Sequence, residues 1–223
     1  MLITKILFLL LGAYLLGSIP FGLIIVKLVT GKDIRTVESG RTGGTNAMRA
    51  AGFGAGLATA ILDLLKGASA VWLARVLFPF QVNPSYAWLH ALAPLAVIVG
   101  HNYSFFLIQK DERGRLRLRG GAGGAPCVGG SFGLWALSIL IILPLGAAVL
   151  FGIGYASLAT LTVALVSTLV FAYRAYIGVS PWQYVLYGVI AELLLVWALR
   201  PNIRRLINGN ERMIGWRAKR KRG

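Results

Sequence analysis

The stretch Ser39-Gly40-Arg41-Thr42-Gly43-Gly44-Thr45-Asn46-Ala47-Met48-Arg49 separates two long apolar runs, and its only large apolar residue is Met48. Its three glycines permit tight turns and leave backbone amides open to a ligand. The hydroxyl and amide side chains add short hydrogen-bonding groups, and two arginines add fixed positive charge. Two interpretations follow: a cradle for a small phosphorylated anion, or a flexible polar loop that joins two membrane helices.

The rest of the chain is strongly apolar. Of its 223 residues, 57% are hydrophobic, and the mean hydropathy is +0.73. Several apolar runs approach the ~20 residues that a bilayer-spanning helix requires. We therefore predict an all-α polytopic integral membrane protein, with a single helical membrane domain over residues 1–208 and a basic cytoplasmic tail over residues 209–223. The first apolar run has no evident small-residue cleavage site, so we expect it to be a retained span.

The charge of the chain points to a membrane rather than to nucleic acid. The net charge is +16, from 23 Lys and Arg against 7 Asp and Glu. The basic residues lie mostly in short segments beside apolar runs, which is the pattern of membrane topology and of contact with anionic lipid headgroups. Trp216, within the basic tail, is predicted to anchor it at the interface. The single cysteine, Cys127, excludes an intrachain disulfide.

Hydropathy and charge together predict seven spans. Six apolar runs are apparent, at residues 2–29, 53–80, 86–108, 137–151, 157–172 and 182–199. Pro20 should kink the first of them. The basic loops around Ser39 and Arg115 and the basic tail should share one side of the membrane, which requires an odd number of crossings. The seventh is predicted as a short glycine-rich helix within residues 124–135, with the N-terminus outside and the C-terminus in the cytoplasm.

Among the charged residues of the predicted spans, Asp63, Lys66 and Glu192 are candidates for a functional role. Asp63 and Lys66 share one face of a helix and can pair, which lowers the cost of burying each charge. Such a pair is either purely structural or orients groups of the polar loop that precedes it. Glu192 is an intramembrane carboxylate with no partner nearby in sequence, and is therefore a functional candidate.

A second polar segment follows the third span. His101 lies at the basic end of that span, and an imidazole that titrates near neutrality suits proton transfer. Arginines then alternate with leucines after Gly114, which indicates a hairpin. The run Gly120-Gly121-Ala122-Gly123-Gly124 is a second candidate anion cradle, with Arg119 at its entrance. It lacks the spacing and the lysine of a P-loop, so no nucleotide site is predicted.

The polar segments at residues 39–49, 100–124 and 200–211 have a family resemblance. In order and spacing they resemble the bacterial acyl-phosphate:glycerol-3-phosphate acyltransferase family (PlsY type) over nearly the whole chain. The first segment is similar to that family's Ser-Gly-Asn-Pro-Gly-Ala-Thr-Asn motif with its following arginine, residues 62–67 to its second helix, and Gly100-His101 to the start of its second motif. Residues that match the first and last motifs are Ser39, Gly40, Gly43, Thr45, Asn46, Arg49, Asn202, Ile203, Arg205, Leu206, Gly209 and Glu211.

The chain also departs from the family pattern. Arg41 and Thr42 stand where the first motif has Asn and Pro. The family's second motif continues into a Lys-Gly-Gly-Lys-Gly core, and this chain carries an insertion before it. Within the core, Arg119 replaces the first lysine and Ala122 replaces the second. Leu199 replaces the usual histidine before the last motif. The resemblance thus indicates a divergent member, and Arg41 or an arginine of the insertion is a candidate to restore the missing charge.

The resemblance implies a reaction and its residues. A fatty acyl group would move from acyl-phosphate to the 1-hydroxyl of glycerol 3-phosphate, giving lysophosphatidate and phosphate for phospholipid synthesis at the cytoplasmic face of the bacterial inner membrane, without cofactor or metal. The implied catalytic residues are His101, Ser39 and Arg49, with His101 either a base or an orienting group. The implied substrate-binding residues are Gly40, Gly43, Thr45, Asn46, Arg119, Gly120, Gly121, Gly123, Asn202 and Glu211.

Three alternatives stay open. The departures at Arg41, Ala122 and Leu199 allow acyl transfer to a different phosphorylated or polyol acceptor. Glycine-rich breaks and intramembrane charges also suit a non-enzymatic transporter of organic anions, although no internal repeat is evident. A thioester route through Cys127 would need an activating base, and the sequence offers none beside it.

Overall fold

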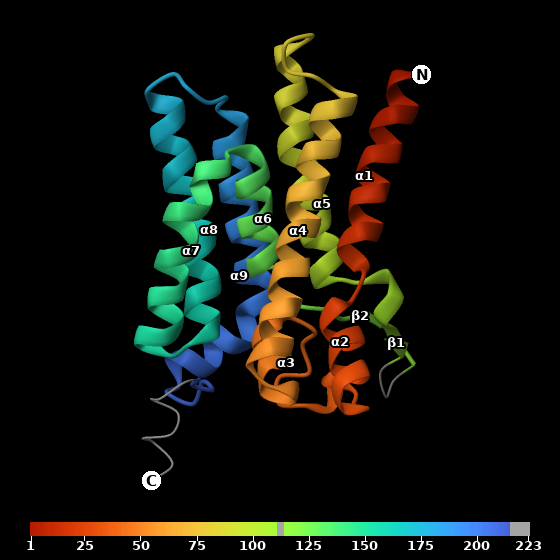
Figure 1. Ribbon diagram of the computed structural model, residues 1–223, viewed down its shortest axis with the longest axis vertical. Helices are drawn as coiled ribbons and strands as arrows, with labels where there is room; N and C mark the ends of the chain where they lie inside the picture. The colour runs from red at the N-terminus through yellow and green to blue at the C-terminus, as the bar shows by residue number, and fades with distance from the viewer. Residues whose placement is uncertain (111–113, 215–223) are drawn as a thin grey trace.

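The computed structural model describes residues 1–110 and 114–214, and nine α-helices account for most of them (Figure 1). In chain order the helices are α1 (Leu2–Ser18), α2 (Phe21–Thr30), α3 (Gly44–Ala51), α4 (Phe53–Leu77), α5 (Ala87–Asn102), α6 (Gly124–Leu134), α7 (Ile139–Ala148), α8 (Ala156–Tyr176) and α9 (Gln183–Ile207). Four short 3-10 helices lie between them: η1 (Ile34–Thr36), η2 (Pro84–Tyr86), η3 (Phe105–Leu107) and η4 (Ala136–Ser138). A π-helical turn, η5 (Val149–Ile153), follows α7. The long helices lie side by side as one bundle.

The bundle is that of a multi-pass membrane protein. Within the described residues, five helical stretches are long and apolar enough to cross a bilayer: Leu2–Thr30, Phe53–Leu77, Ala136–Ile153, Ala156–Tyr176 and Gln183–Ile207. Their outward faces are apolar, as at Phe8, Leu140 and Leu193, which are more than 60% exposed. A surface of this kind is stable against lipid rather than water.

The two remaining long segments form the centre of the bundle. Twelve of the 16 residues of α5 are buried, as are eight of the 11 residues of α6. The short helix predicted within residues 124–135 is therefore present as α6. It is surrounded by α4, α5 and α8 (Figure 1).

The end of the third span was predicted wrongly. That span was expected to reach residue 108, but α5 ends at Asn102, and the apolar residues after it form η3 and the first strand. At the end of α5 the Ser18 carbonyl oxygen accepts a hydrogen bond from the Ser104 hydroxyl, which holds the chain away from the helix axis. The hairpin indicated by the sequence is present, because β1 (Ile108–Lys110) pairs antiparallel with β2 (Leu116–Leu118).

The predicted break at Pro20 separates α1 from α2 and produces a buried ion site. Because the helix stops, the carbonyl oxygen of Gly17 loses its helical donor, and the Phe21 amide donates instead to the carbonyl oxygen of Ile19 at 3.1 Å. The Lys66 ammonium fills this gap, with Nζ 2.9 Å from the first oxygen and 3.1 Å from the second. It also pairs with Asp63 at 2.8 Å, and both side chains are almost fully buried. The predicted ion pair is therefore confirmed, and it fastens α4 to the end of α1.

Glycines allow the central helices to approach closely. A Cβ added at Gly67 of α4 would overlap the carbonyl oxygen of Pro126, and one added at Gly129 of α6 would overlap that of Leu64. Small residues at such interfaces are typical of helix packing in membranes. These contacts fix where α6 begins relative to α4.

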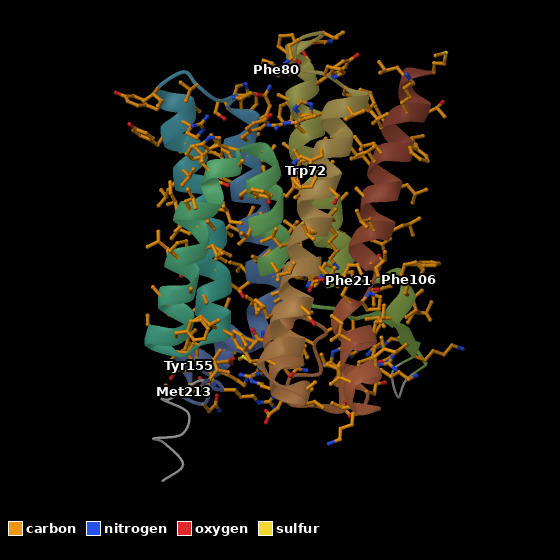
Figure 2. The ribbon with its side chains drawn as sticks, in the orientation of Figure 1. Phe21, Trp72, Phe80, Phe106, Tyr155 and Met213 are labelled. Atoms are coloured by element: carbon orange, nitrogen blue, oxygen red, sulfur yellow. The ribbon has the colours of Figure 1, made fainter. Side chains whose placement is uncertain are left out.

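The polar segments collect at one end of the bundle, beside α3 and the hairpin (Figure 1). The C-terminal segment joins them: Met213 forms a bridge with Tyr155, and the Ile214 amide donates to the Gly154 carbonyl oxygen at 2.9 Å. Figure 2 shows Tyr155 and Met213 together at this end. Residues 210–214 thus pack on the helical domain, whereas Trp216 and the rest of the predicted tail lie outside the described residues.

Candidate active site

The loop of residues 34–41 takes its shape from Asn46. This buried side chain donates its amide N–H groups to the carbonyl oxygens of Ile34, Val37 and Arg41 at 3.2, 3.0 and 2.9 Å. Gly40 has φ +65°, a left-handed conformation that glycine adopts without strain. Of the two interpretations of this stretch, a cradle or a flexible loop, the three hydrogen bonds from Asn46 favour an ordered cradle.

Two helix N-termini line one cavity. The first turn of α3 contributes Gly43, Gly44 and Thr45, and the first turn of α6 contributes Gly124 and Ala125. Helix N-termini carry unpaired amides and partial positive charge, so each is suited to an anion. Gly123 precedes α6 with φ +92°, which lets the glycine run turn directly into the helix.

Arg41 connects three parts of this end of the molecule. Its guanidinium donates to the carbonyl oxygen of Gly121 at 3.0 Å, to that of Ala198 at 2.5 Å, and to the Asn202 side-chain oxygen at 3.5 Å. Three segments distant in sequence therefore meet at one cation. The family pattern has Asn at this position, and Arg41 entered the sequence analysis only as a candidate to restore the missing charge.

The charge around Arg41 is not balanced. Burial lowers the pKa of Arg41 to about 10, and like-charge repulsion from Arg119 and Arg205 acts in the same direction. Burial likewise lowers the pKa of Arg49, which also lines the cavity. A bound anion would relieve both effects, because it would offset the lost solvation of each guanidinium.

Arg119 approaches the loop from the hairpin. Its guanidinium lies 3.4 Å from the Ser39 carbonyl oxygen and packs over Gly40. The Ser39 hydroxyl oxygen accepts a hydrogen bond of 3.4 Å from the Arg41 amide and lines the cavity. The first and second polar segments predicted from the sequence are thus in contact.

His101 lies at the wall of the cavity, between a carboxylate and the glycine run. Its Nδ1 is 3.5 Å from Asp63 Oδ1, and its backbone carbonyl oxygen accepts a hydrogen bond from the Gly121 amide at 2.9 Å. A Cβ added at Gly121 would overlap Nε2 of the imidazole. The carboxylate that pairs with Lys66 therefore also contacts His101, which the sequence suggested only in general terms.

The third polar segment supplies Asn202 and Glu211. The Asn202 amide donates to Glu211 Oε1 at 2.8 Å, and Arg205 Nε donates to Oε2 at 3.0 Å. Glu211 is buried with both oxygens engaged. A carboxylate repels phosphate, so its contribution is to fix the two neighbouring donors.

The cavity enclosed by these groups has a volume of about 270 Å³. One wall is polar, and the other is apolar, formed by Phe53 and Leu57 of α4 with Leu150 and Phe151 of η5. Ala122 and Leu199, where the family pattern has lysine and histidine, also line it. In residues 1–110 and 114–214 no three His, Cys, Asp or Glu side chains cluster as metal ligands.

Most of the site residues predicted from the sequence lie at this cavity, either in its lining or directly behind the lining. Those that line the cavity are Ser39, Gly43, Thr45, Asn46, Arg49, His101, Gly123, Asn202 and Glu211. Gly40, Arg119, Gly120 and Gly121 lie behind this lining, against the loop or His101. The sequence did not predict that Asp63, Gly44 and Ala125 also face the cavity. The spacing of Asp63 and Lys66 predicted that these two side chains pair. The contact between Asp63 and His101 could not be predicted, because it depends on the tertiary structure.

Fold and site together define a multi-pass membrane protein with a cavity at one end of a helical bundle, lined by two helix N-termini and by arginine side chains. The chain belongs to the glycerol-3-phosphate acyltransferase family, whose model matches residues 7–209. The family predicted from the sequence is thereby confirmed.

Named relatives match over nearly their whole length. The chain is 39% identical to the glycerol-3-phosphate acyltransferase of Rubrobacter xylanophilus, with 96% of this chain and 97% of the relative covered. It is 35% identical to glycerol-3-phosphate acyltransferase 3 of Dehalococcoides mccartyi, with 98% and 100% covered. The crystal structure of PlsY (YgiH), an integral membrane glycerol 3-phosphate acyltransferase, in its glycerol 3-phosphate form is similar with a TM-score of 0.78 and 31% identity, covering 95% of this chain and 96% of that one.

Proposed function

We propose that the chain is an acyltransferase that moves a fatty acyl group from acyl-phosphate to the 1-hydroxyl of glycerol 3-phosphate, giving lysophosphatidate and phosphate in phospholipid synthesis. The observation that carries the proposal is a single cavity in which two helix N-termini, Arg49 and His101 oppose an apolar wall. The names of the relatives support the acceptor, and a PlsY crystal structure in the lysophosphatidic acid form supports the product.

This reaction requires the protein to position two substrates, and does not require a nucleophile from the protein. The acceptor hydroxyl oxygen attacks the acyl carbonyl carbon, the bond from that carbon to the phosphate oxygen breaks, and phosphate leaves while the hydroxyl proton passes to a base. Acyl-phosphate is already activated, so no covalent enzyme intermediate is required. The protein must hold two anions together and stabilise the charge that develops on the carbonyl oxygen.

The two helix N-termini suit the two phosphoryl groups. The α3 amides, with Ser39, Thr45 and Arg49, would bind one of them. The α6 amides, with Gly123 and Gly124 at the cavity wall, would bind the other. Gly121 would support this wall from behind, because its amide donates to the His101 carbonyl oxygen. Asn202 would contribute its side chain to the cavity, while Asn46 and Glu211 act mainly by holding the loop and the neighbouring donors in position.

His101 is the proposed base or orienting group for the acceptor hydroxyl. The contact of Asp63 with Nδ1 favours a neutral tautomer that carries its proton on that nitrogen, which leaves Nε2 as a proton acceptor. Asp63 is then a positioning residue, and the substrate's own phosphate is the alternative base. Cys127 is fully buried in α6 away from this wall, which argues against a thioester route.

The apolar wall gives the acyl chain a route from the membrane. Phe53 and Leu57 of α4 form this wall together with Leu150 and Phe151 of η5, and both segments have lipid-facing surfaces. The acyl chain would lie between these segments, with its phosphate at the polar wall.

We further propose seven crossings of the bacterial inner membrane, with the N-terminus outside and the cavity on the cytoplasmic face. The five candidate spans, together with the central α5 and α6, make up the seven. Met1 lies at the opposite end of the bundle from Met213, which supports an odd number (Figures 1 and 2). The excess of basic residues at the cavity end supports the orientation.

A second candidate is transfer to a different phosphorylated or polyol acceptor. It is favoured by Ala122 and Leu199, which give an apolar lining where the family pattern has cationic groups. Arg41, fixed between Gly121 and Asn202, supplies one positive charge near these positions. A screen of acceptors with the same acyl donor distinguishes the two candidates.

The direct test is release of phosphate from palmitoyl-phosphate by the purified protein in detergent or nanodiscs. Release should depend on glycerol 3-phosphate, with lysophosphatidate formed in equal amount. His101→Ala and Arg49→Ala should each lower kcat/KM by roughly 100-fold or more, as expected for loss of a proton-transfer or anion-binding group. Lys27→Ala removes an exposed cation of α2 and serves as the control.

Two results would contradict the proposal. A folded protein that binds both ligands without turnover would exclude the reaction, and counterflow of an organic anion in proteoliposomes would then favour a transporter. Wild-type rates in both the His101 and the Arg49 variants would leave the reaction intact and exclude this cavity as its site.

A further inference from the structure

A short segment after α9 crosses the rim of the cavity. Glu211 lines the cavity and is buried. The Ile214 amide donates to the carbonyl oxygen of Gly154 at 2.9 Å, in the connection between η5 and α8. We refer to residues 209–214 as the C-terminal strap. The strap joins α9 to the wall that η5 and α8 form.

Arg212 of the strap pairs with Glu38 of the loop of residues 34–41. The Arg212 Nε lies 3.4 Å from Glu38 Oε2, and each side chain is 42% exposed. Arg212 directly follows Glu211, which lines the cavity. Glu38 directly precedes Ser39, which also lines it. The ion pair therefore lies at the rim, between the strap and the loop.

The geometry of this ion pair makes it weak. The distance of 3.4 Å is long for a charge-assisted hydrogen bond, and both partners are half-exposed. Ion pairs of this kind contribute little to stability, because solvent screens them. A guanidinium gains more from a phosphoryl group, to which it can donate two parallel hydrogen bonds. A phosphoryl group can therefore replace Glu38 as the partner of Arg212.

Arg49 lies beside the pair and connects it to the cavity. Besides burial, the charges that act on the Arg49 guanidinium are those of Glu38, Arg212 and Glu211. Arg49 itself lines the cavity from α3. A phosphoryl group on Arg49 would attract the Arg212 guanidinium and repel the Glu38 carboxylate. Both forces favour transfer of Arg212 from the carboxylate to the phosphoryl group.

The backbone of Glu38 is held in an unusual conformation. Its φ is +47°, in the left-handed region that side chains disfavour. The turn is closed by a hydrogen bond of 2.9 Å from the Gly40 amide to the Val37 carbonyl oxygen. A non-glycine residue in this region costs energy, and such residues cluster at functional sites. Glu38 thus presents a fixed carboxylate to Arg212.

The lining of the cavity lacks two cations of the family pattern. Ala122 and Leu199 stand where that pattern has lysine and histidine. Arg41 cannot replace both, because its guanidinium already donates to two backbone carbonyl oxygens. Arg212 differs from Arg41, since it is half-exposed and its anionic partner is replaceable.

We propose that Arg212 is a further anion-binding residue of the candidate active site. Glu38 holds the Arg212 guanidinium at the rim, and the phosphoryl group bound by Arg49 replaces Glu38 as its partner. The step is an exchange of ionic partners, in which no covalent bond forms or breaks. The inference rests on the proposed function, because the ligand is a phosphoryl group of one of its substrates.

The test measures the affinity of the purified full-length protein for glycerol 3-phosphate by calorimetry, without an acyl donor, so that no turnover occurs. Arg212→Gln should weaken binding roughly ten-fold, as expected for loss of a hydrogen bond to a charged group. Glu38→Gln should strengthen binding roughly two- to five-fold, because the competing partner of Arg212 is removed. An ion pair with a purely structural role would instead give weaker binding in both variants.

A double variant and two controls complete the series. Glu38→Gln/Arg212→Gln should bind like Arg212→Gln alone, because Glu38 acts through Arg212. Arg204→Gln removes an exposed cation of the same end, outside the cavity lining. Asp33→Asn removes a carboxylate of the same loop region, which pairs with Arg35 at 2.6 Å. Both controls should bind within about two-fold of the wild type, because solvent screens distant charges.

Three results would overturn the proposal. Wild-type affinity in Arg212→Gln would show that the guanidinium does not reach the ligand. Weaker binding in Glu38→Gln would show that the ion pair is only structural. Stronger binding in Glu38→Gln that persists in the double variant would show that Glu38 repels the ligand directly, without Arg212.

Repetition of the series with inorganic phosphate separates this proposal from the proposed reaction. The variants should rank in the same order with inorganic phosphate as with glycerol 3-phosphate. This order, found in a protein that releases no phosphate from palmitoyl-phosphate, would support the role of Arg212 and contradict only the reaction.

Discussion

At the scale of single residues, the candidate active site depends on contacts made behind the cavity wall. Asn46 fixes the loop of residues 34–41, and Glu211 fixes Asn202 and Arg205. His101 is held between Asp63 and the backbone of Gly121. These contacts pre-organise the groups that would meet substrate, and displacement of a reacting group by about 1 Å can cost on the order of 100-fold in rate.

Substitution of Gly121 tests whether His101 must keep its present position. Gly121→Ala should lower kcat roughly 100-fold, because the added methyl group would displace the His101 imidazole. Gly54→Ala is the control, since no atom lies within 4 Å of a Cβ added there. Both variants should retain the wild-type melting temperature within a few degrees, as measured by thermal unfolding in detergent. Full activity in Gly121→Ala would show that His101 is not needed in its present position.

At the scale of elements, the helices are held together by close backbone contact and by one buried ion site. Gly67 and Gly129 bring α4 against α6, so that the N-terminus of α6 opens into the cavity. Lys66 fastens α4 to the end of α1 through two carbonyl oxygens. The packing of the bundle and the geometry of the site therefore share the same residues of α4.

The contact between α4 and α6 can be tested by a paired substitution. Gly129→Ala should lower the free energy of unfolding by roughly 1–3 kcal/mol, because the methyl group would overlap the Leu64 carbonyl oxygen. Gly12→Ala, on an open face of α1, should be neutral or stabilising by up to about 1 kcal/mol, from helix propensity alone. Thermal unfolding in the same detergent measures both. Equal melting temperatures would mean that α6 can move away from α4 at little cost.

At the scale of the whole molecule, one end of the bundle carries the polar segments and the other carries short connections (Figure 1). The cavity lies at the first end, between a polar and an apolar wall, with Arg41 among its lining residues. In the proposed reaction, the acyl donor would reach this cavity from the membrane and glycerol 3-phosphate would reach it from the water.

The proposed orientation is tested by cysteine labelling in a Cys127→Ser background. Lys32→Cys reports on the cavity end and Ser85→Cys on the opposite end, and both positions are exposed. In intact cells made permeable only at the outer membrane, an impermeant maleimide should label Ser85→Cys and should label Lys32→Cys only after the inner membrane is opened. The reverse pattern would place the cavity outside the cytoplasm.

The sequence by itself determined the helical membrane class, the break at Pro20, the short helix within residues 124–135 and nine of the residues that line the cavity. These features depend on local hydrophobicity, on the missing amide hydrogen of proline, and on motifs that stay contiguous along the chain. The hairpin was indicated by the alternation of arginine and leucine, although its exact strands and the end of α5 were not.

Only the tertiary structure decided how the polar segments meet. Arg41 reaches Gly121, Ala198 and Asn202 across 80 or more positions of sequence, and Asp63 reaches His101 from another helix. Such contacts depend on how closely α4, α5 and α6 approach, which is set by the glycines between them. The physical reason is that hydrophobic pattern fixes which face of a helix is buried, whereas the partner of each buried polar group depends on the packing of the complete bundle.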